Sequence, residues 1–258
     1  MIARRVPRLL AAAAVAAWVV SVSVLVCAIP SGAADPCPDV QVVFARGTDD
    51  PPGVGPTGQA FIDSVRPRVG AKSLDVYPVN YPATYDFTNA GKEGIRDASS
   101  HVVSMAHDCP NTNMVLGGFS SGAAVMGFVT SAAVPAGIDP ESVPKPMDPE
   151  VANHVSSVVL YALPSDKMMN FFGAPPVVIG PLYQAKTITV CAPDDPICSG
   201  GGSFEVHKTY STNNPIIDQG AAFAASRLSG GPGAPAGAGP GAPPTGAESS
   251  APGGNFGT

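Results

Sequence analysis

Short apolar runs alternate with amphipathic segments through the middle of this 258-residue chain. Five runs are rich in β-branched residues, have the length of strands and are bounded by Gly, Pro or Asn; they are residues 40–46, 74–81, 114–119, 155–163 and 187–191. The segments between them have apolar residues at helical spacing, namely Phe61, Val65 and Val69; Ile95, Ala98, Val102 and Met105; and Ala221, Ala225 and Leu228. Because parallel strands need crossovers that cover the sheet, this alternation predicts an α/β fold, a three-layer α/β/α sandwich with a central five-stranded parallel sheet.

The two ends of the chain have different patterns. Residues 1–34 combine three early arginines, a long apolar stretch and a small-residue segment before Asp35, which is typical of a secretory signal peptide. The apolar stretch is nearly long enough to span a bilayer, so an uncleaved membrane anchor is the alternative. A lipid anchor at Cys27 is disfavoured, because valine stands where lipoprotein signals need a small residue. We therefore expect a secreted protein that is extracellular or associated with the cell wall.

Residues 230–258 are rich in Gly, Pro and Ala, lack Lys and Arg, and contain Phe256 as their only large apolar side chain. Such a composition buries too little surface to offset chain entropy, so it predicts a disordered tail. The tail is an inert linker or a spacer that contacts the cell envelope. Residues 35–229 remain as one domain, which is expected to be a monomer.

The charge of the chain argues against nucleic acid as a partner. The formal net charge is −6, and removal of residues 1–34 takes away three arginines and no acids, which makes it −9. Nucleic-acid phosphates require clusters of Lys and Arg. The sequence has no basic run after Arg8.

Four cysteines follow the signal segment, namely Cys37, Cys109, Cys191 and Cys198. An even number of cysteines in an exported chain predicts two disulfides. Three pairings are possible, and closeness in sequence favours Cys191 with Cys198, which leaves Cys37 with Cys109. A zinc site is the alternative, but the sequence has no Cys-x-x-Cys pair and no histidine at ligand spacing. We expect neither a metal nor another cofactor.

A serine stands between two glycines in "VLGGFSSGAAV", residues 115–125, where a predicted strand meets a predicted helix. A sharp strand-to-helix turn exposes a serine at the carboxyl edge of the sheet, and glycines on both sides avoid a clash. Ser120 is therefore either a nucleophile or part of a small-residue turn. A serine nucleophile needs a histidine base and an orienting acid, in the chain order Ser, Asp, His.

His207 follows the last predicted strand, in a loop that belongs at the same edge of the sheet as Ser120. The other histidines lie on the predicted helix before Ser120 or ahead of a strand; they are His101, His107 and His154. In "CAPDDPIC", Asp194 and Asp195 are the candidate acids, and forming a turn is their alternative role.

Together these motifs resemble the cutinase family, most closely the mycobacterial cutinase-like secreted esterases. The resemblance covers about Cys37 to Leu228 and rests on "VVFARGT" (42–48), "VNYPA" (79–83), the segment around Ser120, "CAPDDPICSGGG" (191–202) and the loop with His207. It implies an α/β-hydrolase fold and the same two disulfides.

The resemblance also implies roles for individual residues. The nucleophile falls on Ser120 and the base on His207, and the family's spacing from the flanking cysteines selects Asp195 over Asp194 as the acid. The oxyanion hole falls on Thr48 and Ser121. Glutamine is common in the family at the position of Ser121, and because the backbone N–H does most of the work there, the change should tune activity rather than abolish it.

The expected activity is hydrolysis of carboxylic esters through an acyl-enzyme, with short to medium acyl chains. Lipid esters and cutin-like polyesters are candidate substrates. Four side chains are expected either to line an acyl site or to pack into the core; they are Tyr85, Phe87, Phe204 and Val206. The alternatives are a catalytically silent secreted scaffold or antigen, and an acyltransferase or thioesterase with the same triad.

Overall fold

The computed structural model describes residues 37–228. The predicted signal peptide and the predicted tail lie outside the described residues, so both stay predictions, as do the exact limits of the domain. No helix within residues 37–228 is long and apolar enough to cross a membrane.

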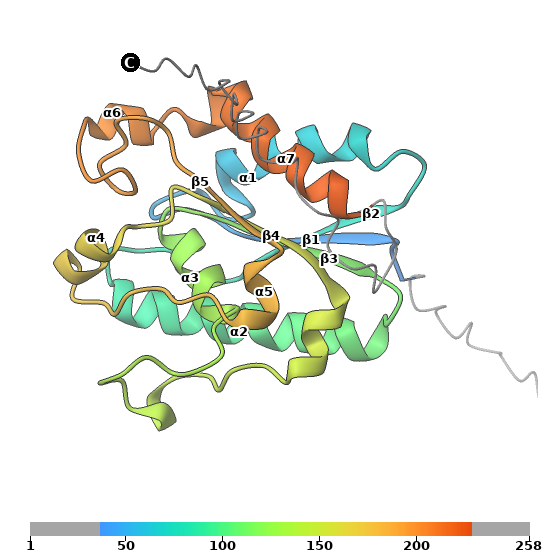
Figure 1. Ribbon diagram of the computed structural model, residues 1–258, viewed down its shortest axis with the longest axis horizontal. Coiled ribbons are helices and arrows are strands. Elements are labelled where there is room, and N and C mark those ends of the chain that lie inside the picture. Colours follow the sequence, from blue (N-terminus) through green and yellow to red (C-terminus); the bar gives the residue numbers. More distant parts are fainter. Residues whose placement is uncertain (1–36, 229–258) are drawn as a thin grey trace, which may run out of the picture. The chain divides into compact units, whose positions relative to one another are not determined.

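A parallel sheet of five strands forms the centre of the domain (Figure 1). The strands are β1 (Val40–Ala45), β2 (Leu74–Pro78), β3 (Asn113–Phe119), β4 (Val155–Tyr161) and β5 (Thr187–Val190). Their order across the sheet is β2-β1-β3-β4-β5, and every neighbouring pair is parallel. The predicted three-layer fold with five parallel strands is therefore confirmed.

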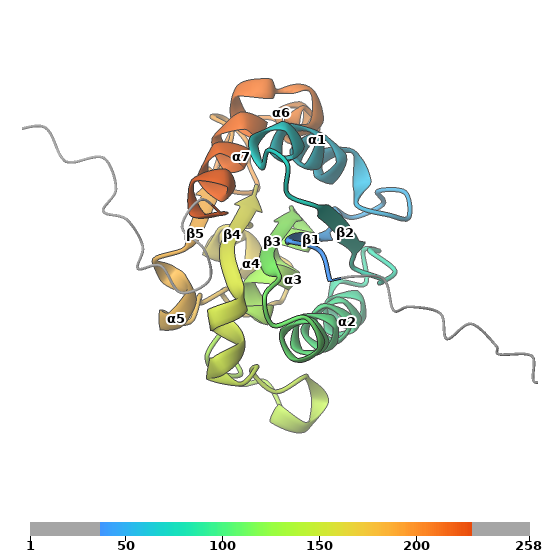
Figure 2. The same ribbon diagram turned by 90° about the vertical axis from the view of Figure 1, so that its right-hand side faces the viewer.

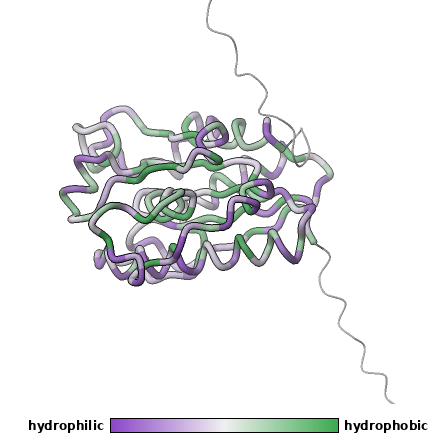
Figure 3. The backbone as a smooth tube through the Cα atoms, turned by 60° about the horizontal axis from the view of Figure 1, so that its bottom comes forward, coloured by the Kyte–Doolittle hydropathy of each residue, from purple (hydrophilic) through white to green (hydrophobic). Residues whose placement is uncertain are grey.

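Helices cover both faces of this sheet. They are α1 (Gly55–Val65), α2 (Phe87–Asp108), α3 (Ser121–Val129), α4 (Asp166–Phe171), α5 (Pro181–Gln184), α6 (Phe204–His207) and α7 (Asn214–Leu228). Figure 2 shows α1 and α7 on one face, and α2 and α3 on the other. One hydrophobic cluster fills the α2–α3 side and a second fills the α1–α7 side. Apolar and hydrophilic positions alternate along the outer helices (Figure 3), as expected for helices with one buried face.

The strand predicted over residues 74–81 ends earlier than expected. The observed strand ends at Pro78, although Val79 N–H still donates a 3.0 Å hydrogen bond to the Phe44 carbonyl of β1. Beyond it the chain leaves the sheet pattern, and Asn80 N–H donates a 2.8 Å hydrogen bond to Asp97 Oδ2 of α2.

The register of the sheet brings three distant segments to one edge. Ala45 at the end of β1 lies opposite Gly118 in β3. Tyr161 in β4 lies opposite Phe119 on one side and opposite Val190, the end of β5, on the other. The loops that follow β1, β3 and β5 therefore meet at the carboxyl edge, where parallel sheets hold their binding sites.

Candidate active site

Ser120 occupies the sharp turn between β3 and α3. Its backbone has φ 55° and ψ −119°, a left-handed conformation that is strained for a residue with a side chain. Its N–H donates a 2.9 Å hydrogen bond to the Tyr161 carbonyl oxygen, which fixes the turn to β4. A Cβ at Gly118 or Gly122 would collide with backbone atoms. Both glycines are therefore required for the geometry that presents Ser120.

His207 lies beside Ser120, with Nε2 2.9 Å from Ser120 Oγ. The sequence predicted a loop here, whereas His207 ends α6, a single helical turn in which the Ser203 hydroxyl accepts a hydrogen bond from Glu205 N–H. The imidazole stacks on Phe119 with ring centroids 4.9 Å apart. Its side chain is only 16% exposed, so the ring is held in place and partly shielded from water.

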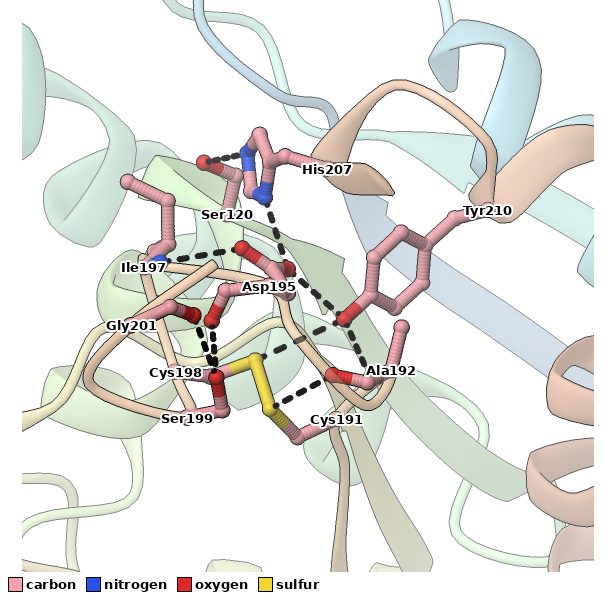
Figure 4. Close-up of a disulfide and its surroundings, with 10 residues drawn as sticks. All are labelled: Ser120, Cys191, Ala192, Asp195, Ile197, Cys198, Ser199, Gly201, His207 and Tyr210. Atoms are coloured by element: carbon pink, nitrogen blue, oxygen red, sulfur yellow. Dashed lines mark hydrogen bonds and ion pairs between the residues drawn. A yellow bond between two sulfur atoms is a disulfide. The ribbon is translucent and has the colours of Figure 1, made fainter. Parts of the chain in front are cut away.

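Asp195 is fully buried and accepts three hydrogen bonds (Figure 4). Its Oδ2 is 2.9 Å from His207 Nδ1 and also accepts from the Tyr210 hydroxyl at 2.8 Å. Its Oδ1 accepts from Ile197 N–H at 2.9 Å. Burial raises the pKa of the Asp195 carboxyl, but the hydrogen bonds from His207, Ile197 and Tyr210 outweigh that effect and hold the pKa below its ordinary value. The group is therefore a carboxylate at neutral pH.

Asp194 points away from this chain of hydrogen bonds. Its side chain is exposed, its backbone has φ 63°, and its carbonyl accepts a hydrogen bond from Ser203 N–H. The family resemblance selected Asp195 of these two aspartates, and Asp195 is the one that the structure brings to His207. The other histidines have different partners: His101 contacts Gln41 and Tyr77, His107 contacts Asp108, and His154 contacts the Pro110 carbonyl.

Both disulfides have the pairing that the sequence favoured. Cys191 and Cys198 close the loop that carries Asp195, with Cα atoms 5.9 Å apart. Figure 4 shows Asp195 between this disulfide and His207, with Tyr210 to one side and its hydroxyl directed at Asp195. Cys37 and Cys109 join the start of β1 to the end of α2, with Cα atoms 5.5 Å apart. The Cys191–Cys198 disulfide therefore borders the site, and the Cys37–Cys109 disulfide cross-links the chain at the opposite end of the sheet.

The turn after β1 brings Thr48 to Ser121. Thr48 Oγ1 donates a 2.8 Å hydrogen bond to Ser121 Oγ, and both residues line the same cavity as Ser120. Ser121 is the first residue of α3, where backbone N–H groups have no acceptor within the helix. The carboxylate of Asp50 accepts from Gly47 N–H at 2.9 Å and braces the turn.

A cavity of about 890 Å³ opens from Ser120 and His207. Tyr85, Phe87 and Phe204 line it, as the sequence suggested, and Tyr85 and Phe204 are largely exposed at its rim. Val206 is instead partly buried against the cluster on the α1–α7 side. Apolar residues on and just after α4 complete one wall; they are Met168, Met169, Phe171, Phe172 and Ala174. Among residues 37–228, no group of three or more His, Cys, Asp or Glu side chains could hold a metal ion.

Sequence reasoning did not find several residues of this site. Tyr210 lies three residues after His207, and burial raises the pKa of its phenol, which keeps the hydroxyl protonated and able to donate to Asp195. Phe119 directly precedes Ser120 and stacks on His207. The spacing of Tyr210 from His207, about one helical turn, was the only signal for it in the sequence.

A model of the cutinase family matches residues 36–228. The chain belongs to the cutinase family. Similar proteins include the carboxylesterase Culp1 of Mycobacterium tuberculosis, 44% identical over an alignment 216 residues long, which covers 81% of this chain and 93% of Culp1. The phospholipase Culp4 of the same organism is 41% identical over 226 residues, 88% of this chain and 93% of Culp4.

A solved cutinase has the same fold. It is a Trichoderma reesei cutinase in complex with a phosphonate inhibitor, 33% identical, with a TM-score of 0.57 over 75% of this chain and 78% of that chain. The predicted resemblance to the cutinase family is therefore confirmed, and the protein described by this sequence is a carboxylic ester hydrolase.

Proposed function

We propose that this esterase hydrolyses its substrates with Ser120 as nucleophile, His207 as general base and Asp195 as the acid that orients His207. The observation that carries the proposal is the unbroken chain of hydrogen bonds from Ser120 Oγ through both ring nitrogens of His207 to Asp195 Oδ2, with both distances 2.9 Å. A serine hydroxyl is a poor nucleophile unless a base takes its proton, and this arrangement supplies the base.

In the proposed reaction, Ser120 Oγ attacks the ester carbonyl carbon while His207 Nε2 takes the hydroxyl proton. His207 then gives that proton to the departing alcohol, which leaves an acyl group on Ser120. Water, deprotonated by His207, attacks the acyl-enzyme and releases the carboxylic acid. Asp195 keeps the Nδ1 proton in place, so Nε2 is free to accept the proton from Ser120.

Thr48 and Ser121 are the proposed oxyanion hole. The N–H groups of both residues and the Thr48 hydroxyl would donate to the oxygen that becomes negative during attack. The hydrogen bond from Thr48 to Ser121 holds that hydroxyl at the site before substrate binds. Loss of one such donor typically raises the barrier by about 3 to 4 kcal/mol.

The proposed substrates are carboxylic esters, with lipid esters among them. The cavity beside Ser120 is lined mainly by apolar side chains, and aromatic side chains stand at its rim. Its volume of about 890 Å³ suits a hydrocarbon chain together with an alcohol group. The name of the relative Culp4, a phospholipase, is consistent with lipid substrates.

We also propose that the enzyme is exported and acts outside the cell or at the cell wall, as a monomer. The signal-like pattern of residues 1–34 supports export. Two disulfides in one domain are typical of oxidising compartments. A contact of residues 230–258 with the cell envelope remains part of this proposal.

A fluorophosphonate probe tests the proposed nucleophile. We expect one covalent adduct per folded molecule, and fragmentation of the labelled peptide should locate it on Ser120 rather than on Ser121. Chemically denatured protein is the control and should stay unlabelled, because the reactivity of Ser120 depends on His207. A folded protein without the adduct would favour a silent scaffold over an enzyme. In a separate experiment, an alcohol added to the reaction would be converted to a new ester if the protein were an acyltransferase.

Selective loss of the Cys191–Cys198 disulfide should lower turnover. The bridge closes the short loop whose backbone positions Asp195, and small displacements of catalytic groups cost up to about a hundredfold. We expect the double variant Cys191→Ser, Cys198→Ser to lose about ten- to a hundredfold in kcat on a butyrate ester. The matched control, Cys37→Ser with Cys109→Ser, removes the distant bridge and should reduce thermal stability while kcat stays near wild type. Equal kcat values for wild type and the double variant Cys191→Ser, Cys198→Ser would mean that the loop keeps its shape without the disulfide.

A further inference from the structure

A second cavity, of about 190 Å³, adjoins the cavity beside Ser120. It lies between the first half of α2, the segment of residues 131–146 that follows α3, and residues 173–175. Four residues line both cavities and form the wall between them; they are Phe87, Gly91, Phe128 and Ala174. The mechanism proposed above makes no use of this second cavity.

The lining of the second cavity suits hydrocarbon. Most of its side chains are apolar, among them Ile95, Val134, Pro135, Ile138 and Val143. No Asp or Glu is among the lining residues, although the chain as a whole is acidic. Its charged residues are Lys92 and Lys145, whose methylene stems can add to an apolar wall while the ammonium groups stay in water. An uncharged chain therefore fits this space better than a cation does.

Gly91 leaves a gap in the wall between the two cavities. It lies inside α2, and a Cβ built on it would have no neighbouring atom within 4 Å. At Gly94, one turn later, close packing explains the glycine, because a Cβ there would press on Tyr81 and Val125. Glycine inside a helix is unfavourable relative to alanine, and no packing contact explains Gly91. Because Gly91 has no side chain, the space beside this position of α2 stays open between the two cavities.

The geometry of α3 indicates how long a chain must be to reach the wall. Phe128 lies eight residues after Ser120, which is about 12 Å along a helix. An extended chain advances about 1.2 Å per bond, so an acyl chain that runs along α3 from Ser120 reaches Phe128 after about ten carbons. Any longer chain must bend out into solvent or pass the gap at Gly91.

We propose that the second cavity holds the distal carbons of a long acyl chain whose carbonyl carbon lies at Ser120. The inference rests on the proposed function and deepens it, because it extends the substrates from short and medium chains to esters of fatty acids with fourteen to eighteen carbons. The chain passes over Gly91, between Phe87 and Phe128, and its last carbons lie among the apolar residues of the second cavity.

A chain-length series tests the inference. The substrates are p-nitrophenyl butyrate, decanoate and palmitate, presented in the same detergent, and the readout is the ratio of kcat/KM for palmitate to that for butyrate. Burial of one methylene is worth about a factor of four in affinity, so blocking several should be easy to detect. We expect wild type to hydrolyse palmitate at least as efficiently as decanoate. Gly91→Leu, which fills the gap, should lower the ratio by about tenfold or more.

Three further variants make the series specific. Gly91→Ala adds only a methyl group and should change the ratio less than Gly91→Leu does. Ser100→Leu adds the same side chain at an exposed position of α2 that lines neither cavity, and should keep the wild-type ratio. Ala133→Phe adds a large side chain at an exposed residue that lines the second cavity but not the first, and should lower the ratio even if Gly91→Leu fails to fold.

The outcomes separate this inference from the proposed function. If Gly91→Leu and Ala133→Phe both fold and both keep the wild-type ratio of kcat/KM for palmitate to that for butyrate, the second cavity is not an acyl site. The proposed esterase mechanism would be unaffected by that result. A sharp fall in kcat/KM between decanoate and palmitate in wild type would overturn the second cavity as an acyl site as well. A wild-type protein with no activity on butyrate would instead contradict the proposed function.

Discussion

Ser120→Ala is expected to lower kcat on p-nitrophenyl butyrate by between about 10,000-fold and 1,000,000-fold. The variant has no oxygen to attack the carbonyl, and His207 Nε2 loses the group whose proton it accepts. Ser120 makes its backbone hydrogen bond through N–H, which alanine keeps. Because the loss is chemical, KM should change much less than kcat.

Ser121→Ala is the matched control for this prediction. It removes a hydroxyl one position away, and with it the hydrogen bond that Ser121 accepts from Thr48. The backbone N–H that we assign to the oxyanion hole remains. We expect kcat to fall less than about tenfold, since only the orientation of the Thr48 hydroxyl is affected. A Ser120→Ala protein that retained more than one hundredth of wild-type kcat would exclude Ser120 as the nucleophile.

The three central strands, β1, β3 and β4, were readable from the sequence because their side chains are buried on both faces of the sheet. Residues such as Val42 and Val43 in β1 are both fully buried, so the strand has an unbroken apolar run. The short elements of the second half were not predicted. In α4, for example, Met169 is buried but Phe171 is exposed, and a six-residue segment contains too few repeats of a helical period to be recognised.

The site was predictable to a different degree for each residue. Ser120 stood out because the turn that presents it requires Gly118 and Gly122, which leave a local pattern. The partners Asp195 and Tyr210 are 15 residues apart, one in the loop after β5 and the other at the start of a short 3-10 helix, and they meet only in the folded chain. No local pattern encodes that placement, so the residues alone left Asp194 and Asp195 open and the choice of Asp195 came from the family resemblance.

Asp195→Asn is expected to lower kcat by about 10,000-fold. The carboxylate accepts from Tyr210 and Ile197 and holds the Nδ1 proton of His207. An asparagine has one oxygen and one NH2 group, so it cannot accept from all three donors. If the oxygen faces Ile197, the NH2 group faces His207 and favours the tautomer with a proton on Nε2, which cannot accept the proton of Ser120.

Asp194→Asn is the control, because it makes the same chemical change at the adjacent residue. Asp194 is exposed, and asparagine tolerates its positive φ, so kcat and stability should both stay near wild type. If Asp194→Asn were the variant that lost activity, the assignment of the acid to Asp195 would be wrong. Comparable kcat values for Asp195→Asn and wild type would exclude an orienting role for this carboxylate.

The pH dependence of stability gives Asp195 a second, independent test. Since hydrogen bonds lower the pKa of Asp195 in the folded protein, its carboxylate stabilises the fold above the pKa of the unfolded carboxyl. That contribution is lost as the pH falls through the lower pKa of the folded state. Asparagine does not titrate and leaves a buried donor unpaired, which typically costs about 1 to 3 kcal/mol. Denaturant unfolding should therefore find Asp195→Asn less stable than wild type at pH 7. The difference should shrink as the pH falls below the ordinary pKa of an aspartate and through the lower pKa of folded Asp195.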